Sequence, residues 1–167
     1  MRLTHVDERG RAQMVDVGDK PESERTAVAV GAVRMSREAF EQVAAQAVVK
    51  GDVLAVAEVA GTMGAKRTGE LIPLCHPLGL DLIQVEARLE PELPGVRVTA
   101  RARTIGRTGV EMEAMTAVAV ACLTVYDMVK AVDRGMVIEE VSLLSKTGGT
   151  RGDWHRSESS AERGSHK

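Results

Sequence analysis

A histidine held between two prolines is the first feature that suggests chemistry in this chain of 167 residues. His76 follows Cys75 in residues 71–78 (LIPLCHPL), where the prolines exclude a regular helix. Imidazole titrates near neutral pH, so a rigidly held His76 could move a proton or bind a ligand. The alternative is a histidine satisfied within the fold. Extended neighbours point to opposite sides, so a Cys75-His76 nucleophilic pair is not expected.

Charged residues mark both ends of one long apolar segment. Glu111 and Glu113 stand at its start, and Asp127 and Lys130 near its end. Ordinary helix-end electrostatics and a surface ion pair would explain them. Glu113 and Asp127 nevertheless share a helix face that is otherwise apolar, which favours a site.

The separation of these groups suggests a dimer. Glu113 and Asp127 are 14 residues apart, which is about 21 Å along a helix axis and too far for one small ligand to contact both. If both ends serve the same site, two chains must meet, and a two-fold dimer with antiparallel copies of this helix would bring Glu113 near Asp127 and Lys130 of the partner subunit.

Further cations lie near expected element ends. Lys50, Lys66 and Lys146 could each reach a shared ligand, although any one of them considered alone is more simply a solvated lysine. Residues 61–68 lack the Gly-Lys-Ser/Thr spacing of a phosphate-binding loop. The glycines after Lys146 would suit a mobile flap or a flexible exit to the C-terminal tail.

The composition excludes several functions. With one Phe, one Tyr and one Trp, the chain cannot build a stacking platform or an aromatic cage. A net charge of -2 gives no basic field, so no nucleic-acid partner is expected. No membrane partner, secretory leader or zinc site is expected, and the reducing cytoplasm fits best. A core of small residues gains little per position, which favours subunit association.

The chemistry-bearing residues must be positioned by an α+β fold. We predict a strand at 26–35, a helix from a Ser36 cap to Lys50, and a helix at 53–66 capped by Asp52. A hairpin of strands 80–90 and 96–105 precedes a helix at 108–133, which a capping box of Thr108 and Glu111 opens. A strand at 136–144 and a loop at 145–152 follow. Residues 1–155 should form one catalytic domain, an antiparallel sheet with helices on one face, and 156–167 a disordered tail.

Six segments, in this order, resemble the MoaC family of cyclic pyranopterin monophosphate synthases. They are residues 50–53 (KGDV), 65–68 (AKRT), 71–78 (LIPLCHPL), 108–114 (TGVEMEA), 126–131 (YDMVKA) and 146–149 (KTGG). The resemblance runs from about residue 3 to residue 153. It departs from the family at Gly64, where a better helix former is common, and at Arg107, where the family often has Lys.

The resemblance implies the second step of molybdenum cofactor biosynthesis, in which 3',8-cyclo-7,8-dihydro-GTP becomes cyclic pyranopterin monophosphate and pyrophosphate. It implies a ferredoxin-like fold, a hexamer built as a trimer of dimers and no required cofactor, with magnesium allowed but not indicated. Asp127 would be catalytic, and Lys50 and Lys130 would be acid/base lysines. The substrate-binding residues would be Leu74, Cys75, His76, Met112, Glu113, Arg25, Lys66, Glu111 and Lys146.

Two other classes of function stay open at this point. A non-catalytic, nucleotide-sensing α+β oligomer would bind the ligand without turnover. A nucleotide phosphotransferase would need an acidic metal site and a glycine-rich phosphate loop, and would depend strictly on magnesium.

Overall fold

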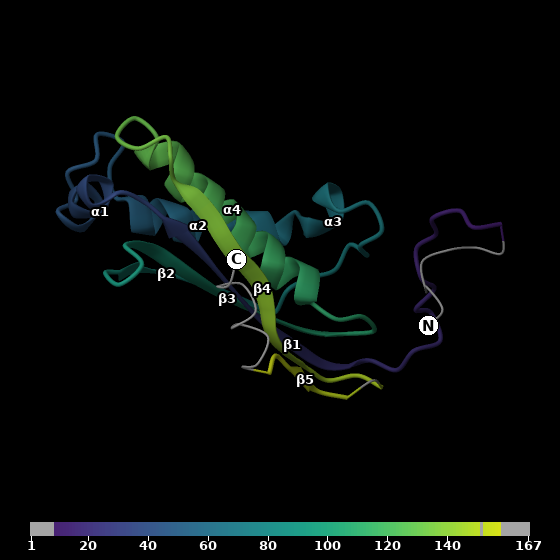
Figure 1. The fold of residues 1–167 in the computed structure, drawn as a ribbon. Coiled ribbons are helices and arrows are strands. Elements are labelled where there is room, and N and C mark those ends of the chain that lie inside the picture. The colour runs from purple at the N-terminus through teal and green to yellow at the C-terminus, as the bar shows by residue number, and fades with distance from the viewer. Residues whose placement is uncertain (1–8, 151, 158–167) are drawn as a thin grey trace, which may run out of the picture.

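The computed structural model describes residues 9–150 and 152–157. Figure 1 shows the elements, whose bounds are β1 (Ser23–Arg34), α1 (Arg37–Ala44), α2 (Val53–Lys66), α3 (Thr68–Leu71), β2 (Leu82–Glu90), β3 (Gly95–Gly106), α4 (Glu111–Val129), β4 (Val137–Thr147) and β5 (Trp154–His155).

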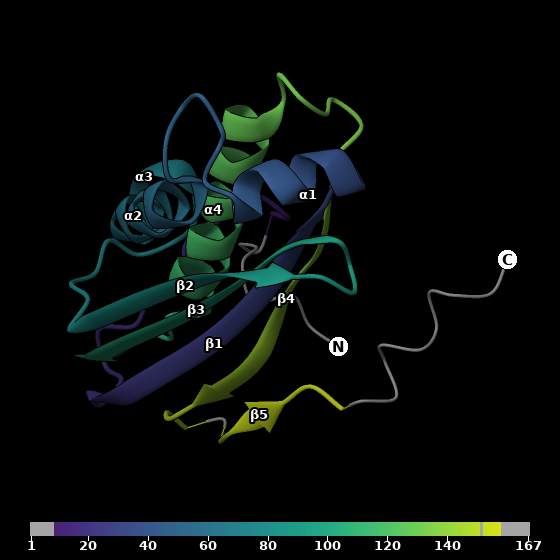
Figure 2. The ribbon, with the colours of Figure 1, turned by 90° about the vertical axis from the view of Figure 1, so that its left-hand side faces the viewer.

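The strands form one antiparallel sheet in the order β2-β3-β1-β4-β5. Figure 2 shows the helices gathered on one face of this sheet. The first four strands, with helices after β1 and after β3, have the β-α-β-β-α-β connectivity of ferredoxin-like folds. The predicted α+β, ferredoxin-like architecture is therefore confirmed.

Small residues let α4 lie close to the sheet and to α2. A Cβ on Gly31 of β1 would stand 2.6 Å from the Val118 side chain, and one on Gly61 of α2 would stand 2.8 Å from the main-chain oxygen of Ala117. Both glycines are thus packing positions. Although α4 is long and apolar enough to cross a membrane by length and composition, most of that stretch is buried inside this fold.

The first predicted helix is too long, and the error matters for Lys50. α1 begins after the predicted Ser36 cap, whose side chain accepts from the Ala39 N–H, but it ends at Ala44. Gln46 takes a left-handed φ of 52°, and Val49 is fully exposed. Lys50 therefore lies in a loop and not at a helix end.

The capping-box prediction at α4 is wrong. The helix begins at Glu111, after Val110, and no side chain caps it. The Glu111 carboxylate instead accepts a hydrogen bond from Lys146 on β4, at 2.7 Å. Lys146, which is 35 residues away in the sequence, therefore pairs with this carboxylate in place of the main-chain N–H of a capping box. α4 also ends earlier than predicted, at Val129.

The loop predicted from residue 145 begins too early. β4 continues through Thr147, and β5 pairs with it at Ser145 and Lys146. The Gly148 N–H donates to the Asp153 carboxylate at 3.0 Å, which holds the turn between the two strands. Of the predicted tail, Arg156 donates its main-chain N–H to Leu144 at 2.8 Å, and residues 158–167 lie outside the described part.

Candidate active site

Three charged side chains meet at the C-terminal end of α4. Lys50 Nζ lies 2.7 Å from Asp127 Oδ2, and Lys130 Nζ lies 2.6 Å from Asp127 Oδ1. Lys50 also donates to the main-chain oxygen of Asp127 at 2.8 Å. Each oxygen of one carboxylate therefore faces a different ammonium group.

Local turns hold the two lysines in place. In the loop between α1 and α2, the Gly51 N–H donates to Val48 at 2.9 Å, with Gly51 at a φ of 99°. Asp52 then caps α2 by accepting from the Ala55 N–H at 3.1 Å. Lys130 is the C-cap residue of α4, directly after Val129. Two regular helix ends thus fix the backbone on either side of the cluster.

The cluster is ionised and open to solvent. Hydrogen bonds from Lys130 and then Lys50, together with their charges, lower the pKa of Asp127 to about 2. All three side chains are about half exposed. At neutral pH, Asp127 is therefore a carboxylate, and the ammonium groups remain within reach of a ligand from outside.

A pocket of about 620 Å³ lies at the other end of α4, within the usual size of small-molecule sites. The predicted site residues that line it are Arg25, Leu74, Cys75, His76, Glu111, Met112, Glu113 and Lys146. They come from β1, the segment after α3, the first turn of α4 and the end of β4.

The two glutamates of the pocket differ in environment. Glu113 is only 4% exposed, and burial, with a smaller contribution from the Glu111 charge, raises its pKa. Glu111 is paired with Lys146. The Glu111 side chain folds back over Gly109, so its carboxylate atoms are the nearest to the position that a Cβ would take there. Burial thus favours the proton-donating form of Glu113, whereas Glu111 is held as an ion pair.

The segment carrying Cys75 and His76 is held by α3 and β3. A Cβ on Gly69 of α3 would lie 3.2 Å from Pro77 Cα, and Thr104 of β3 donates its hydroxyl to the Gly79 carbonyl at 2.6 Å. Burial and the Glu113 charge raise the pKa of the Cys75 thiol. Cys75 is therefore a neutral thiol at pH 7 and a poor nucleophile.

Among the residues that the structure describes, four cationic side chains line the same pocket: Arg25, Lys146, Lys20 and Arg107. Arg25 Nε donates to the Gly106 carbonyl at 3.3 Å. Lys20 and Arg107 were not among the predicted site residues. Lys20 lies in an irregular N-terminal segment whose sequence carries no local signal of a site, and only the folded structure brings it to the pocket.

Lys66 joins neither group. It lines a separate hollow between α2 and β2, with Met63 and Arg101. The remaining candidates fall into two sets at opposite ends of α4, and its 19 residues span about 28 Å. As the spacing predicted, no small ligand could contact both sets within one chain.

The middle of the α4 face that was expected to carry a site is covered by α2. A Cβ on Gly64 of α2 would stand 2.7 Å from the Val120 side chain, and Gly61 packs equally closely on Ala117. The apolar character of the middle of that face is therefore explained by packing on α2, whereas its two ends place Glu113 in the pocket and Asp127 in the lysine cluster. α4 instead exposes another stripe, with Met112 at 37% and Leu123 at 58%.

No aromatic side chain lines the pocket among the residues described. Phe40 is in the core, and Trp154 lies on β5, 41% exposed. In the same part of the chain, no group of three or more His, Cys, Asp or Glu side chains is arranged to hold a metal ion. The pocket thus offers hydrogen bonds, charge and aliphatic contacts to a ligand.

The region in which this chain is similar to known proteins includes both ends of α4. A family model described as the MoaC family matches residues 14–149. A protein of Thermomicrobium roseum named cyclic pyranopterin monophosphate synthase is 57% identical over 159 residues, 95% of this chain and 96% of that protein. Proteins with the same name are 58% identical in Cereibacter sphaeroides, over 93% of this chain and 98% of theirs, and 56% identical in Brucella ovis, over 92% and 93%.

Proposed function

This chain belongs to the MoaC family and is a lyase of molybdenum cofactor biosynthesis, and from that premise we propose that it converts 3',8-cyclo-7,8-dihydro-GTP into cyclic pyranopterin monophosphate and pyrophosphate. One observation carries the proposal. A ligand pocket and a lysine-aspartate cluster lie at opposite ends of α4, and each supplies part of what this reaction needs.

The two parts come together in a dimer. The exposed stripe of α4 runs from Met112, which lines the pocket, through half-buried Ala119 and exposed Leu123 to Lys130 in the cluster. If two copies pack antiparallel through this stripe, the pocket of one subunit meets the lysine cluster of the other. Leu123, 58% exposed, supports such a contact, because its apolar side chain otherwise faces water. Three such dimers would make the hexamer.

The pocket binds the substrate. Arg25 and Lys146 supply positive charge for the triphosphate, and His76 and Glu113 supply hydrogen bonds to the purine-derived rings. Recognition without aromatic stacking agrees with the lining of the pocket. Lys66 would contact the phosphates only if they extend beyond the pocket or if another subunit contributes it.

The lysine cluster moves protons. Opening the five-membered ring and closing the pyran ring require repeated proton transfers, for which Lys50 and Lys130 are placed on one carboxylate. Asp127 keeps both ammonium groups in position. In our assignment Lys130, oriented by Asp127, handles one proton, and Lys50 delivers another.

Formation of the cyclic phosphate releases pyrophosphate. A ribose-derived hydroxyl attacks the α-phosphorus, the bond from that phosphorus to the oxygen bridging to the β-phosphate breaks, and the hydroxyl proton passes to a base. Charge that develops on the phosphate oxygens is stabilised by the surrounding Lys and Arg side chains. We propose that the chain needs no cofactor for these steps and that it works in the cytoplasm.

Incubation with the cyclised GTP derivative tests the proposal. The expected result is release of one pyrophosphate per cyclic monophosphate formed, with activity retained after treatment with a chelator. Binding of the ligand without turnover would instead identify a nucleotide-sensing oligomer. Turnover only with magnesium, by transfer to another nucleotide, would identify a phosphotransferase.

A further inference from the structure

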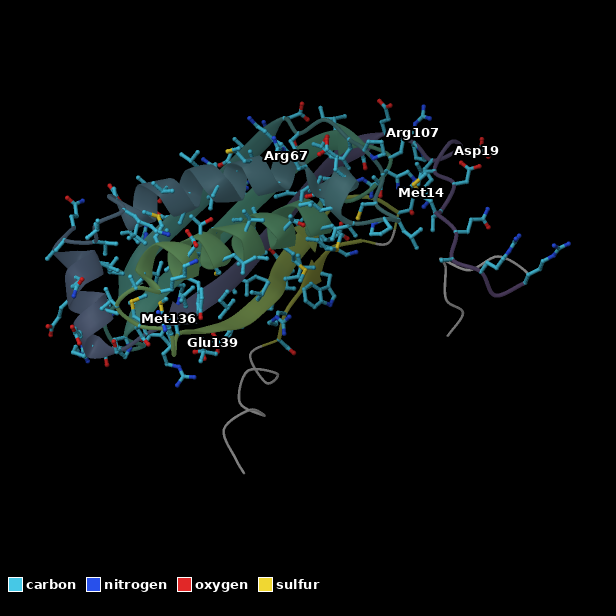
Figure 3. All side chains as sticks on the ribbon, turned by 90° about the horizontal axis from the view of Figure 1, so that it is seen from above. Met14, Asp19, Arg67, Arg107, Met136 and Glu139 are labelled. Carbon is cyan, nitrogen blue, oxygen red and sulfur yellow. The ribbon has the colours of Figure 1, made fainter. Side chains whose placement is uncertain are left out.

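The segment of residues 14–20, here called the N-terminal strap, lies across one edge of the pocket without belonging to a helix or a strand. Figure 3 shows Met14 and Asp19 beside Arg107 at that end of the molecule. We propose that this strap is part of the active site, where it fixes the tautomer of His76 and closes one wall of the pocket. This inference deepens the proposed function and rests on it for the role of His76.

The contact with His76 is a single hydrogen bond of defined direction. His76 Nε2 lies 2.8 Å from the main-chain oxygen of Val15. A carbonyl oxygen only accepts, so the hydrogen is on Nε2. In the neutral ring, Nδ1 then carries the lone pair and is left to accept a hydrogen bond or a proton from a ligand. Val15 thus acts as a positioning residue through its backbone.

The strap has enough local structure to hold that carbonyl in place. The Gly18 N–H donates to the Asp16 carboxylate at 2.8 Å, and the Lys20 N–H donates to the Val17 carbonyl at 3.1 Å. These two bonds close a turn within the strap. The Val15 carbonyl therefore enters the pocket on a folded turn and not on a loose chain.

Arg107 is the second anchor. Its Nη1 donates to the Gly18 carbonyl at 3.0 Å, and its Nε lies 3.7 Å from Glu22. A guanidinium can make both contacts at once because its nitrogens form a rigid fork, whereas the single nitrogen of a lysine cannot match that geometry. The two anchors, at Val15 and Gly18, are three residues apart and hold the turn from both sides.

The anchored strap changes what the pocket presents to a ligand. Val15 and Val17 add an apolar wall, and Lys20 adds a cation. Without the strap, His76 Nε2 would lose its carbonyl partner, and either ring nitrogen could carry the hydrogen. Strap position and His76 tautomer are therefore coupled through one hydrogen bond.

The test measures the His76 ring directly. Nitrogen-15 NMR of the ring, assigned with His76→Gln, would be recorded for the full chain without ligand, at a pH where the ring is neutral. We expect hydrogen on Nε2 in the wild type and a mixture of tautomers both in a variant lacking residues 1–20 and in Arg107→Ala. Arg88→Ala, which removes a guanidinium paired with Glu86 outside the pocket, is the matched control.

Steady-state kinetics supply the second readout. Arg107→Ala should lower kcat/KM on the order of tenfold, and Arg107→Lys should lower it less, because it keeps one contact. Hydrogen on Nδ1 in the wild type, or an unchanged tautomer in Arg107→Ala and in the shortened chain, would overturn the inference. Since the NMR experiment needs no substrate, it can fail while the proposed reaction stands, and the pyrophosphate assay can fail while the tautomer stands.

Discussion

Lys50 donates from one ammonium group to both the carboxylate and the main-chain carbonyl of Asp127, at 2.7 and 2.8 Å. The two residues are 77 positions apart, so this contact ties the loop between α1 and α2 to the last turn of α4. Lys130 occupies the other carboxylate oxygen at 2.6 Å. The arrangement presents two ammonium groups on one fixed anion, and the first two predictions below follow from it.

Asp127→Asn should lower kcat on the order of 100-fold, because the two ammonium groups lose the anion that orients them. The fold should survive, since the cluster is solvent-exposed. Asp52→Asn is the matched control. It removes a carboxylate two residues from Lys50 but keeps the cap of α2, because Asn caps helices as well as Asp does. Near wild-type turnover in Asp127→Asn would rule out the role given to this carboxylate.

The Asp127 carboxyl should titrate far below its ordinary pKa of 3.8, at about 2. Because the folded-state pKa is depressed, the stability from this group is present above pH 3.8 and is lost as the pH falls toward 2. Carbon-13 NMR of the carboxyl measures it. Lys130→Ala should raise the midpoint more than Lys50→Ala, since Lys130 makes the larger contribution. A wild-type midpoint at or above 3.8 would contradict the geometry of the cluster.

The two thiols should alkylate slowly near neutral pH. Burial raises the pKa of Cys122 to about 11, and burial with the Glu113 charge raises that of Cys75 above 9.0. Mass spectrometry of iodoacetamide adducts against pH measures both rates. Cys75 should react before Cys122, which is fully buried. Glu113→Gln should speed the reaction of Cys75, because it removes the charge that helps to raise the pKa of this thiol. Fast labelling of Cys75 at pH 7 would show a thiolate and reopen a nucleophilic role.

Gly148→Ala should destabilise the fold and lower activity more than Gly152→Ala. Both glycines have positive φ values, 90° and 72°, so each alanine is strained by about 1 kcal/mol. A Cβ at Gly148 would in addition collide with the main-chain oxygen of Glu24, next to Arg25, whereas Gly152 has open space around it. Thermal unfolding and pyrophosphate release measure the two effects. Equal losses of stability and activity in both variants would mean that the close approach of Gly148 to β1 adds nothing to the effect of the alanine.

Features set by neighbouring residues could be predicted from the sequence. The caps at Ser36 and Asp52 are confirmed, because a cap needs only a side chain and an N–H three residues later. The hairpin of β2 and β3 and the overall α+β architecture are confirmed for a similar reason, since alternation and turn residues specify them locally.

Contacts between distant residues could not be predicted in this way. Glu111 has the spacing of a capping box, but Lys146 takes its carboxylate. The end of α1 depends on Gln46 in a left-handed conformation, and no glycine stands at this position to indicate such a conformation in the sequence. The Lys50-Asp127 contact and the place of Lys20 in the pocket depend on how the chain folds back. Lys50 was a candidate cation from its position in the sequence, its acid/base role came from the family resemblance, and nothing in the sequence indicated Lys20.

Subunit complementation tests the composite site most directly. Glu113→Ala and Lys130→Ala chains, each inactive alone and differently tagged, would be unfolded together, refolded and assayed for pyrophosphate release. Random pairing puts one intact site in each mixed dimer, so activity should return to about a quarter of the wild type. If purified mixed dimers stay inactive, both ends of α4 do not serve one site across two chains, and the central claim is wrong.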